Sequence, residues 1–388
     1  MPPRAARLDD LRPFHVMRLL ERARELESAG RNIVHMEIGE PDFATPEPVV
    51  AAGHQALQGG RVHYTPARGL ATLRQAVGRY YHERYGVDVD PNRILITPGA
   101  SGALQLALAA LVDPGRGVML SDPGYPCNRN LVRLIEGTVQ AVPVGAVEGY
   151  QLTPQLAAAH WRADTAAVLV ATPANPSGTL LPRAALAELA ELCRGRSTAL
   201  IVDEIYQGLT YGAEDITALA LGEDIFVINS FSKFFGMTGW RLGWLVVPPD
   251  YAADLDVLAQ NLFLAAGTLS QRAALAAFAP ATRTILEQRR ETFRQRRDFL
   301  LPALRELGFD IPVTPEGAFY LYANCRALAG DSFELSQRLL EEAGVAVTPG
   351  IDFGDHRAGE HVRFAYTTSL EMLEEGVARL RRFLCSQA

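Results

Sequence analysis

The sequence has few cysteines and no apolar run long enough to cross a membrane. Its four cysteines, Cys127, Cys193, Cys325 and Cys385, form no C-x-x-C pair, and their spacings suit neither a zinc site nor a disulfide framework. Separate thiols favour a reducing compartment. The longest apolar runs, such as Leu104–Val112, reach about half of a membrane span. Because the basic N-terminus has no apolar segment behind it, it does not predict a secretory signal. We expect a soluble, cytoplasmic protein.

The charge of the chain is also low and mixed in sign. Lys and Arg number 37 and Asp and Glu 44, which gives a net charge of −7. This balance lacks the strong positive field that nucleic-acid binding requires, so we expect no nucleic-acid partner. Hydrophobic residues make up 48% and charged residues 21%, which is globular composition and excludes a disordered chain.

The chain contains no internal repeat and no linker rich in glycine and serine. At roughly 100–200 residues per domain, its 388 residues predict two domains. Residues 14–29 have the spacing of an amphipathic helix, and residues 33–43 indicate a short strand that runs into a loop. From about residue 94 to 247, short apolar runs alternate with helical segments such as 101–111 and 183–193. The expected strands are Ile94–Thr97, Val118–Ser121, Ala167–Thr172, Leu200–Asp203, Ile225–Asn229 and Leu242–Val247.

Several of these strands are apolar on both faces, which is typical of a mostly parallel sheet covered by helices. Residues 283–308 predict a long charged helix that leads to a C-terminal α+β part. That part is expected to contain strands at 318–322, 345–348 and 361–366 and helices at 333–343 and 370–384. Ligand sites in such α/β folds lie at the carboxyl ends of the strands, so the residues that follow the strands are the ones to inspect.

A small-residue turn, Thr97–Gly102, joins a predicted strand to a helix. Free N–H groups at a helix N-terminus favour a phosphate, and small residues let the anion approach closely. The turn lacks the full G-x-G-x-x-G and P-loop patterns. Taken alone, such a segment is more often an ordinary turn than a phosphate site.

Two further polar groups follow predicted strands. Asn175 begins an N-P-S-G segment, which could be a plain turn or could present an amide to a ligand oxygen. Asp203 ends an apolar strand, where a carboxylate needs a partner such as a cationic ring nitrogen. The alternative is that Asp203 caps the next helix. Tyr206 could direct its hydroxyl at the same ligand.

The fourth group centres on Lys233, in the segment Ser230–Gly243. A lysine among aromatic and small residues is atypical of a solvated surface, although a loop lysine is the alternative. Burial lowers the pKa of an amine and makes it a usable nucleophile toward a carbonyl. Ser230, Ser232 and Arg241 could donate to a phosphate, Arg241 through a bidentate fork.

Together these groups match what pyridoxal 5′-phosphate requires: a lysine for its aldehyde, a carboxylate for its ring nitrogen, donors for its 3′-oxygen, and N–H groups with an arginine for its phosphate. We expect no metal site.

The sequence resembles the class I and II aminotransferases, pyridoxal-phosphate enzymes of fold type I. The resemblance extends from IGEPDF (residues 38–43) to VRFAY (362–366) and includes N-P-S-G, D-E-I-Y and S-x-S-K followed by G-x-x-G-x-R-x-G. It implies a large domain (residues 44–283) with a mostly parallel seven-stranded sheet. It also implies a smaller α+β domain made of residues 1–43 and 284–388.

The resemblance assigns roles residue by residue. Lys233 should hold the cofactor aldehyde and move the proton, Asp203 should pair with the ring nitrogen, and Tyr206 with Asn175 should hold the 3′-oxygen. Tyr125 should stack on the ring, and Arg363 should bind the substrate α-carboxylate with help from Gly39 and Asn175. Phosphate contacts are expected at Gly99, Ala100, Ser101, Ser230, Ser232 and Arg241, with Tyr64 reaching the site of the other subunit of a homodimer.

The implied reaction moves the α-amino group of an L-amino acid to a 2-oxo acid, 2-oxoglutarate or pyruvate, in two half-reactions. A C–S β-lyase or another amino-acid lyase on the same fold is the alternative. An amino-acid-binding regulator is disfavoured because the resemblance begins too near the N-terminus for a DNA-binding segment, and a purely structural α/β protein would ignore the cofactor.

The identity of the substrate is left open by the sequence. Relatives that act on aspartate can carry a lysine at the position of Ser101, so its absence speaks against aspartate. Phe14, His15 and Tyr64 near the entrance could suit aromatic or neutral amino acids.

Overall fold

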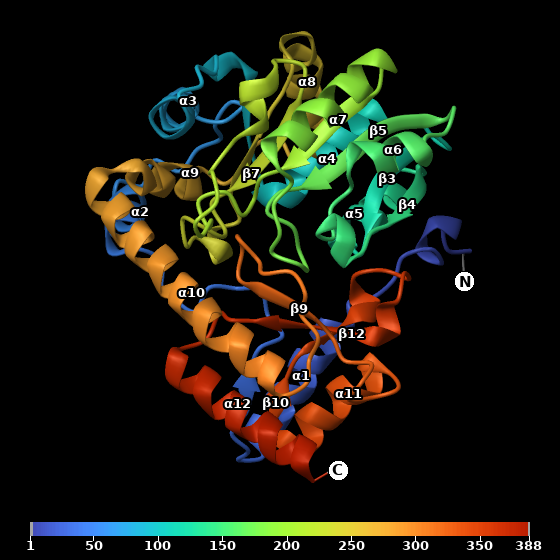
Figure 1. The fold of residues 1–388 in the computed structure, drawn as a ribbon. Coiled ribbons are helices and arrows are strands. Elements are labelled where there is room, and N and C mark those ends of the chain that lie inside the picture. The colour runs from blue at the N-terminus through green and yellow to red at the C-terminus, as the bar shows by residue number, and fades with distance from the viewer. Residues whose placement is uncertain (1–2, 387–388) are drawn as a thin grey trace.

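The computed structural model describes residues 3–386, and a seven-stranded sheet forms its largest layer (Figure 1). The strand order is β2-β8-β7-β6-β5-β3-β4. The strands are β2 (Ile94–Thr97), β3 (Gly117–Asp122), β4 (Thr138–Pro143), β5 (Thr165–Ala171), β6 (Ala199–Asp203), β7 (Phe226–Ser230) and β8 (Gly243–Val246). All neighbouring pairs are parallel except those of β8 with β2 and β7. The mostly parallel seven-stranded sheet is therefore confirmed.

The sequence-based assignment omitted β4. This strand lies at the edge of the sheet beside β3, and its residues alternate between buried and exposed instead of forming a continuous apolar run. Edge strands do not need the double-sided apolar pattern of central strands, so the pattern that identified the other strands did not identify this one.

Alternate residues of the central strands point into two separate cores. Leu200 and Val202 pack in the core on one face of the sheet, while Ile201 packs in the core on the other. This period of two is what a strand covered on both faces requires. Helices α3 (Ala71–Tyr85) and α7 (Arg183–Gly195) contribute to the first core, and α4 (Gly99–Leu111) and α8 (Ala252–Leu262) to the second. The remaining helices of this part are α2 (Glu47–Gln58), α5 (Pro126–Leu134), α6 (Pro154–Ala159) and α9 (Thr268–Ala274).

A second, smaller assembly combines both ends of the described chain. Strand β1 (Val34–His35) pairs in parallel with β10 (Val345–Ala346), and β12 (His361–Ala365) pairs antiparallel with β9 (Tyr320–Asn324) and β11 (Thr348–Pro349). Helices α1 (His15–Ser28), α11 (Ser332–Arg338) and α12 (Leu370–Cys385) accompany these strands (Figure 1). We call this assembly the small lobe, and the seven-stranded sheet with its helices the large lobe.

The single strand predicted at 345–348 is wrong in one respect. The segment forms two short strands, and β10 joins β1 whereas β11 joins β12. A run of apolar residues does not show that the chain changes partner within it, because both halves are equally buried.

The long helix α10 (Pro280–Glu306) passes from the large lobe to the small lobe (Figure 1). It begins at residue 280, so the domain boundary expected at 283/284 falls in its first turn, and the division at 43/44 and 283/284 stays a prediction. No helix within residues 3–386 is both long and apolar enough to span a bilayer.

Candidate active site

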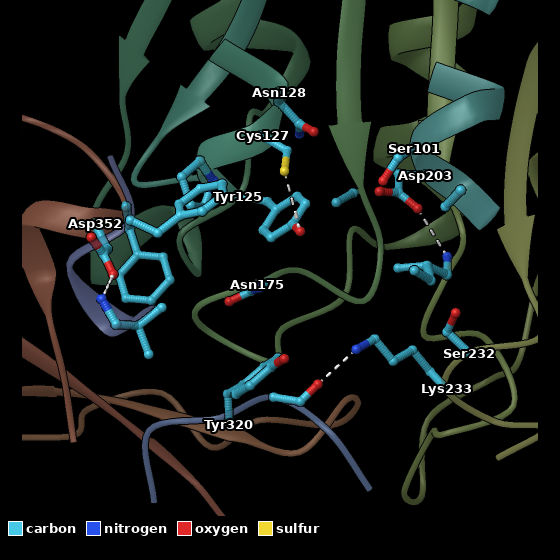
Figure 2. Close-up of a pocket in the computed structure, with 18 of the residues that line it drawn as sticks. Ser101, Tyr125, Cys127, Asn128, Asn175, Asp203, Ser232, Lys233, Tyr320 and Asp352 are labelled. Carbon is cyan, nitrogen blue, oxygen red and sulfur yellow. Dashed lines mark hydrogen bonds between the residues drawn. The ribbon is translucent and has the colours of Figure 1, made fainter. Parts of the chain in front are cut away.

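A cavity of about 280 Å³ lies where the strand ends of the large lobe face the small lobe. Figure 2 shows Lys233 and Ser232 on one side of it, Asp352 on the opposite side, and Tyr125 and Asn175 between them. Most of the site residues predicted from the sequence line this cavity: Gly39, Ala100, Ser101, Tyr125, Asn175, Asp203, Tyr206, Ser232, Lys233, Arg241 and Arg363. The structure therefore brings together groups that are up to 324 positions apart in the chain, since Gly39 and Arg363 share this cavity.

Lys233 is the only lysine in the sequence; the other residues among the 37 Lys and Arg are arginine. Its Nζ donates to the carbonyl of Gly39 at 2.6 Å. Burial, together with the nearby guanidinium groups of Arg363 and Arg241, lowers the pKa of this ammonium to about 8. A lysine with a pKa near neutrality is available as a nucleophile and as a base.

Asp203 ends β6 with its carboxylate 8% exposed. One oxygen accepts a hydrogen bond from the N–H of Ile205 at 3.0 Å, and burial raises the pKa of this carboxyl to about 6. The neighbouring Glu204 is fully buried but turns to another element, where it accepts hydrogen bonds from Thr217 and from the N–H of Ala218. Of these two adjacent acidic residues, Glu204 therefore holds the segment at Thr217 and Ala218, and only Asp203 lines the cavity.

The start of α4 and Arg241 form a compact anion cradle. Gly99 has a φ of +71°, and a Cβ on it would lie 2.8 Å from a terminal nitrogen of Arg241. A Cβ on Gly243 would lie 2.8 Å from the backbone nitrogen of Ala100. Only glycine permits both the backbone angle and the close approach. The first N–H groups of α4 and the Arg241 guanidinium are thus close together at the part of the cavity that Ser101 and Ser232 also line.

Three predicted site residues do not line the cavity. Gly99 contributes through its backbone, because its positive φ and its missing Cβ allow Arg241 to approach closely. The Ser230 hydroxyl is buried and donates to the Leu242 carbonyl at 3.1 Å while accepting from the N–H of Ser232, so it shapes the loop that carries Lys233. Tyr64 is 85% exposed and lies outside the cavity of its own chain.

Arg363 on β12 forms the second cationic centre and is 5% exposed. Its guanidinium donates to Oδ1 of Asn175 at 2.9 Å and to the Glu37 carbonyl at 2.5 Å. The hydroxyl of Thr348 lies 3.2 Å away. Its Nε is buried and has no protein partner among residues 3–386, so the guanidinium keeps an unused donor at the cavity.

Sequence reasoning missed Tyr320. Its hydroxyl lies 2.8 Å from the Tyr206 hydroxyl, and its ring lies 4.3 Å beneath the Arg363 guanidinium carbon. A Cβ at Gly39 would collide with the Tyr320 hydroxyl. Tyr320 therefore touches the phenol, the guanidinium and the glycine that the sequence assigned separately.

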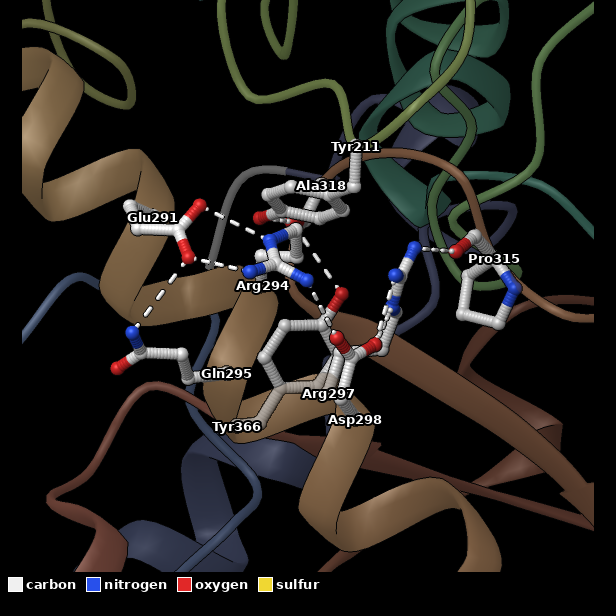
Figure 3. Close-up of polar contacts among 9 residues, drawn as sticks. All are labelled: Tyr211, Glu291, Arg294, Gln295, Arg297, Asp298, Pro315, Ala318 and Tyr366. Atoms are coloured by element: carbon white, nitrogen blue, oxygen red, sulfur yellow. Dashed lines mark hydrogen bonds and ion pairs between the residues drawn. The ribbon is translucent and has the colours of Figure 1, made fainter.

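The position of Tyr320 is fixed by a network around Ala318, two residues earlier (Figure 3). Ala318 has a φ of +56°, an unfavourable angle for alanine. Its carbonyl accepts hydrogen bonds from the hydroxyls of Tyr211 and Tyr366. Arg297 of α10 lies over the Tyr211 ring and donates to the Pro315 carbonyl at 2.9 Å. No local pattern in the sequence indicates this arrangement, because its members come from both lobes and α10.

The sequence model of the family described as aminotransferase class I and II matches residues 31–380. The chain belongs to the class I and II aminotransferases. Its reaction is the transfer of an amino group between amino acids and keto acids. The resemblance read from the motifs is confirmed, as is the α/β fold that it implied.

Several characterised proteins are similar to this aminotransferase along their whole length. A valine–pyruvate aminotransferase of Mycobacterium tuberculosis is 37% identical over 389 residues, covering 100% of both chains. A crystal structure of an aminotransferase from Mycobacterium tuberculosis superposes with a TM-score of 0.96 at 36% identity, again covering 100% of both chains. The aspartate aminotransferase of Thermus thermophilus with maleate gives a TM-score of 0.93 at 34% identity, covering 98% of this chain and 100% of that one.

Proposed function

We propose that this aminotransferase uses pyridoxal 5′-phosphate, held at Lys233, to move the α-amino group of an L-amino acid to a 2-oxo acid in two half-reactions. The observation that carries the proposal is the sole lysine of the sequence, which lines the cavity with its Nζ beside the carbonyl of Gly39. The cofactor supplies an aldehyde that condenses with amines and a ring that accepts an electron pair.

The residues present fit this cofactor at both of its ends. Because Gly99 and Gly243 have no Cβ, the backbone N–H groups at the start of α4 and the guanidinium of Arg241 can both reach one anion, which suits a phosphate. Asp203, which lines the same cavity, presents a buried carboxylate with a raised pKa. A cationic ring nitrogen would supply the partner that this carboxylate needs.

Each remaining residue has a task that its contacts support. Lys233 takes the α-proton from the substrate and returns it, for which a pKa of about 8 is suitable. Tyr206 and Asn175 orient the 3′-oxygen, and Tyr125 covers the ring face. Arg363, whose Nε is unused, grips the α-carboxylate through its planar fork.

The relatives reported above are aminotransferases, so amino-group transfer is favoured over β-elimination. Their names include both a valine–pyruvate and an aspartate enzyme, and pyruvate or 2-oxoglutarate is the acceptor that we propose. We also propose a cytoplasmic homodimer. In support of the dimer, Tyr64 is 85% exposed, and other large apolar side chains of the large lobe are also exposed: Leu57, Val62, Leu262 and Leu264.

Borohydride reduction of the native enzyme tests the proposal directly. Because Lys233 is the only lysine, an ε-amine label can lie at one position alone, and peptide mapping should find it there. Lys233→Arg removes the last lysine while keeping the charge. It should abolish the cofactor absorbance and lower turnover at least about a thousandfold, since a general base contributes 10²–10⁴. An unchanged spectrum or label in the variant would refute the assignment of Lys233.

A further inference from the structure

Polar and apolar side chains both line the active-site cavity. Asp203, Ser101 and Ser232 lie on the side of Lys233, whereas Asp352 marks the opposite end (Figure 2). Apolar side chains that have no role in the proposed cofactor contacts also line the cavity. We call six of them the side-chain wall: Phe14, Val16, Met17, Ile38, Leu131 and Phe353.

Half of the side-chain wall comes from the start of α1 and the residue before it. The helix body is anchored in the small lobe, where Leu19, Ala23 and Leu26 are buried. Its first turn, however, has no side-chain cap from Phe14, the residue at the N-cap position. Uncapped N–H groups at a helix start need an acceptor from elsewhere.

Asp352 supplies that acceptor from more than 330 residues away in the chain. Its two carboxylate oxygens accept hydrogen bonds from the N–H groups of His15 at 2.7 Å and Val16 at 2.8 Å. Asp352 is 6% exposed and lines the cavity itself. It therefore fixes Phe14 and Val16 at the edge of the cavity and places a carboxylate beside them.

The charges that this chain itself places around the cavity leave no cation for a second substrate carboxylate. Among the cavity-lining residues in the described part of the chain, the cations are Lys233, Arg241 and Arg363. The proposed function uses Lys233 for the cofactor aldehyde, Arg241 for the phosphate and Arg363 for the α-carboxylate. An acidic side chain at the wall would meet Asp352 and apolar groups, and an unpaired charge is costly to bury there.

We propose that the side-chain wall binds uncharged, apolar substrate side chains, in the amino donor and the 2-oxo acid alike, and that Asp352 is the positioning residue that holds the wall in place. This inference rests on the proposed function, because it presupposes that Arg363 binds the α-carboxylate. The name of the valine–pyruvate relative agrees with it.

Half-reactions of the holoenzyme test the substrate class. Methionine, glutamine and glutamate have similar lengths, so their conversion, followed by the change in cofactor absorbance, separates charge from size. We expect kcat/KM for methionine to exceed that for glutamate at least about a hundredfold, with glutamine between them. Pyruvate should likewise exceed 2-oxoglutarate as acceptor. Equal or faster reaction with glutamate and 2-oxoglutarate would overturn the inference.

Asp352→Ala and Asp352→Asn test the positioning role. Removing the cap should lower kcat/KM for leucine about tenfold more than for alanine, because only leucine fills the wall. Asp352→Asn keeps one acceptor oxygen and should give a smaller change in the same ratio. Asp90→Asn is the matched control, since Asp90 also caps a helical turn, at the N–H of Asn92, but lies outside the cavity.

The outcomes separate the wall from the chemistry. An unchanged leucine-to-alanine ratio in both Asp352 variants would refute the positioning role, even if stability fell. If the wild-type enzyme converts alanine but prefers acidic substrates, the inference about the side-chain wall is refuted while the proposed aminotransferase function still stands. If no amino acid changes the cofactor spectrum, the proposed function itself is refuted, and so is the inference about the side-chain wall that rests on it.

Discussion

The large-lobe side of the active site and its small-lobe side hold polar groups in different ways. On the large-lobe side, Asp203, Asn175 and Lys233 follow strands of one sheet, each within a short local motif. On the small-lobe side, Gly39, Tyr320 and Asp352 come from separate segments, and only Gly39 lies within a motif recognised in the sequence, IGEPDF.

The two sides also differ in how each group is held. Asp203 accepts a hydrogen bond from the N–H of Ile205, and the N–H of Ser232 donates to the Ser230 hydroxyl, so both are held by groups two residues away. Arg363 and Asp352 contact groups more than 180 residues away. The large-lobe side is therefore suited to binding an invariant cofactor, whereas the small-lobe side can differ in shape with modest changes at distant positions. Substitutions on each side, paired with matched controls, test this difference.

The largest effect is expected on the large-lobe side. Asp203→Asn should lower kcat about 10²–10³-fold, because a preorganised charge at the cofactor ring is lost. Glu204→Gln is the control, since Glu204 is also buried and its pKa is raised to about 8, but it bonds Thr217 instead of lining the cavity. Steady-state rates of the two variants should differ sharply. Equal losses would mean that burial in this segment matters and the cavity position does not.

On the small-lobe side, Arg363→Lys keeps the charge and removes the planar fork. We expect kcat/KM to fall by at least about thirtyfold, corresponding to about 2 kcal/mol for a disrupted buried charge contact. The measurement is kcat and KM with one amino acid, and the fall in kcat/KM should come from an increase in KM. Arg296→Lys alters another buried arginine, paired with Asp42 at 2.8 Å away from the cavity, and should change stability while leaving KM alone.

A smaller effect is expected where the two sides touch. Tyr320→Phe removes the hydrogen bond to Tyr206 and keeps the ring under Arg363, so kcat should fall about three- to tenfold, as one hydrogen bond of about 1 kcal/mol predicts. Combined with Tyr206→Phe, the loss should be less than multiplicative. Tyr322→Phe is the control on the same strand, because its buried hydroxyl has no partner in residues 3–386. Fully independent losses in the double variant would show that the two hydroxyls are not coupled.

The smallest effect concerns stability and pH. Hydrogen bonding to Glu37 raises the pKa of His35 to about 9, and the carbonyl of Glu37 holds Arg363. Since the folded state keeps the proton longer than the unfolded state, this stabilisation is complete below about pH 6.5 and is lost as pH rises through 9. His35→Gln should cost on the order of 1 kcal/mol at pH 6, given partial exposure, and little at pH 10. Urea unfolding at both pH values checks this. A cost that does not change with pH would exclude the ion pair as its cause.

The same contrast explains which parts could be predicted from the sequence. The strands of the large sheet, the small-residue turn at Gly99 and the motif around Lys233 depend on neighbours a few residues away, and these neighbours are visible in the periodicity and composition of each segment. Strand β4 was not predicted, because an edge strand has a mixed pattern of buried and exposed residues. The unique lysine was a further signal in the composition that could have marked Lys233 without any motif.

The sequence by itself determined the alternating large lobe and the chemistry at the strand ends, because side-chain period and local turns follow from adjacent residues. Only the tertiary structure decided that Tyr320 lies beneath Arg363, that β10 and β11 join different sheets, and that Asp352 caps α1. Contacts of that kind form between segments that are tens to hundreds of residues apart. Their strength comes from burial and hydrogen bonding between surfaces that the chain brings together only when it folds.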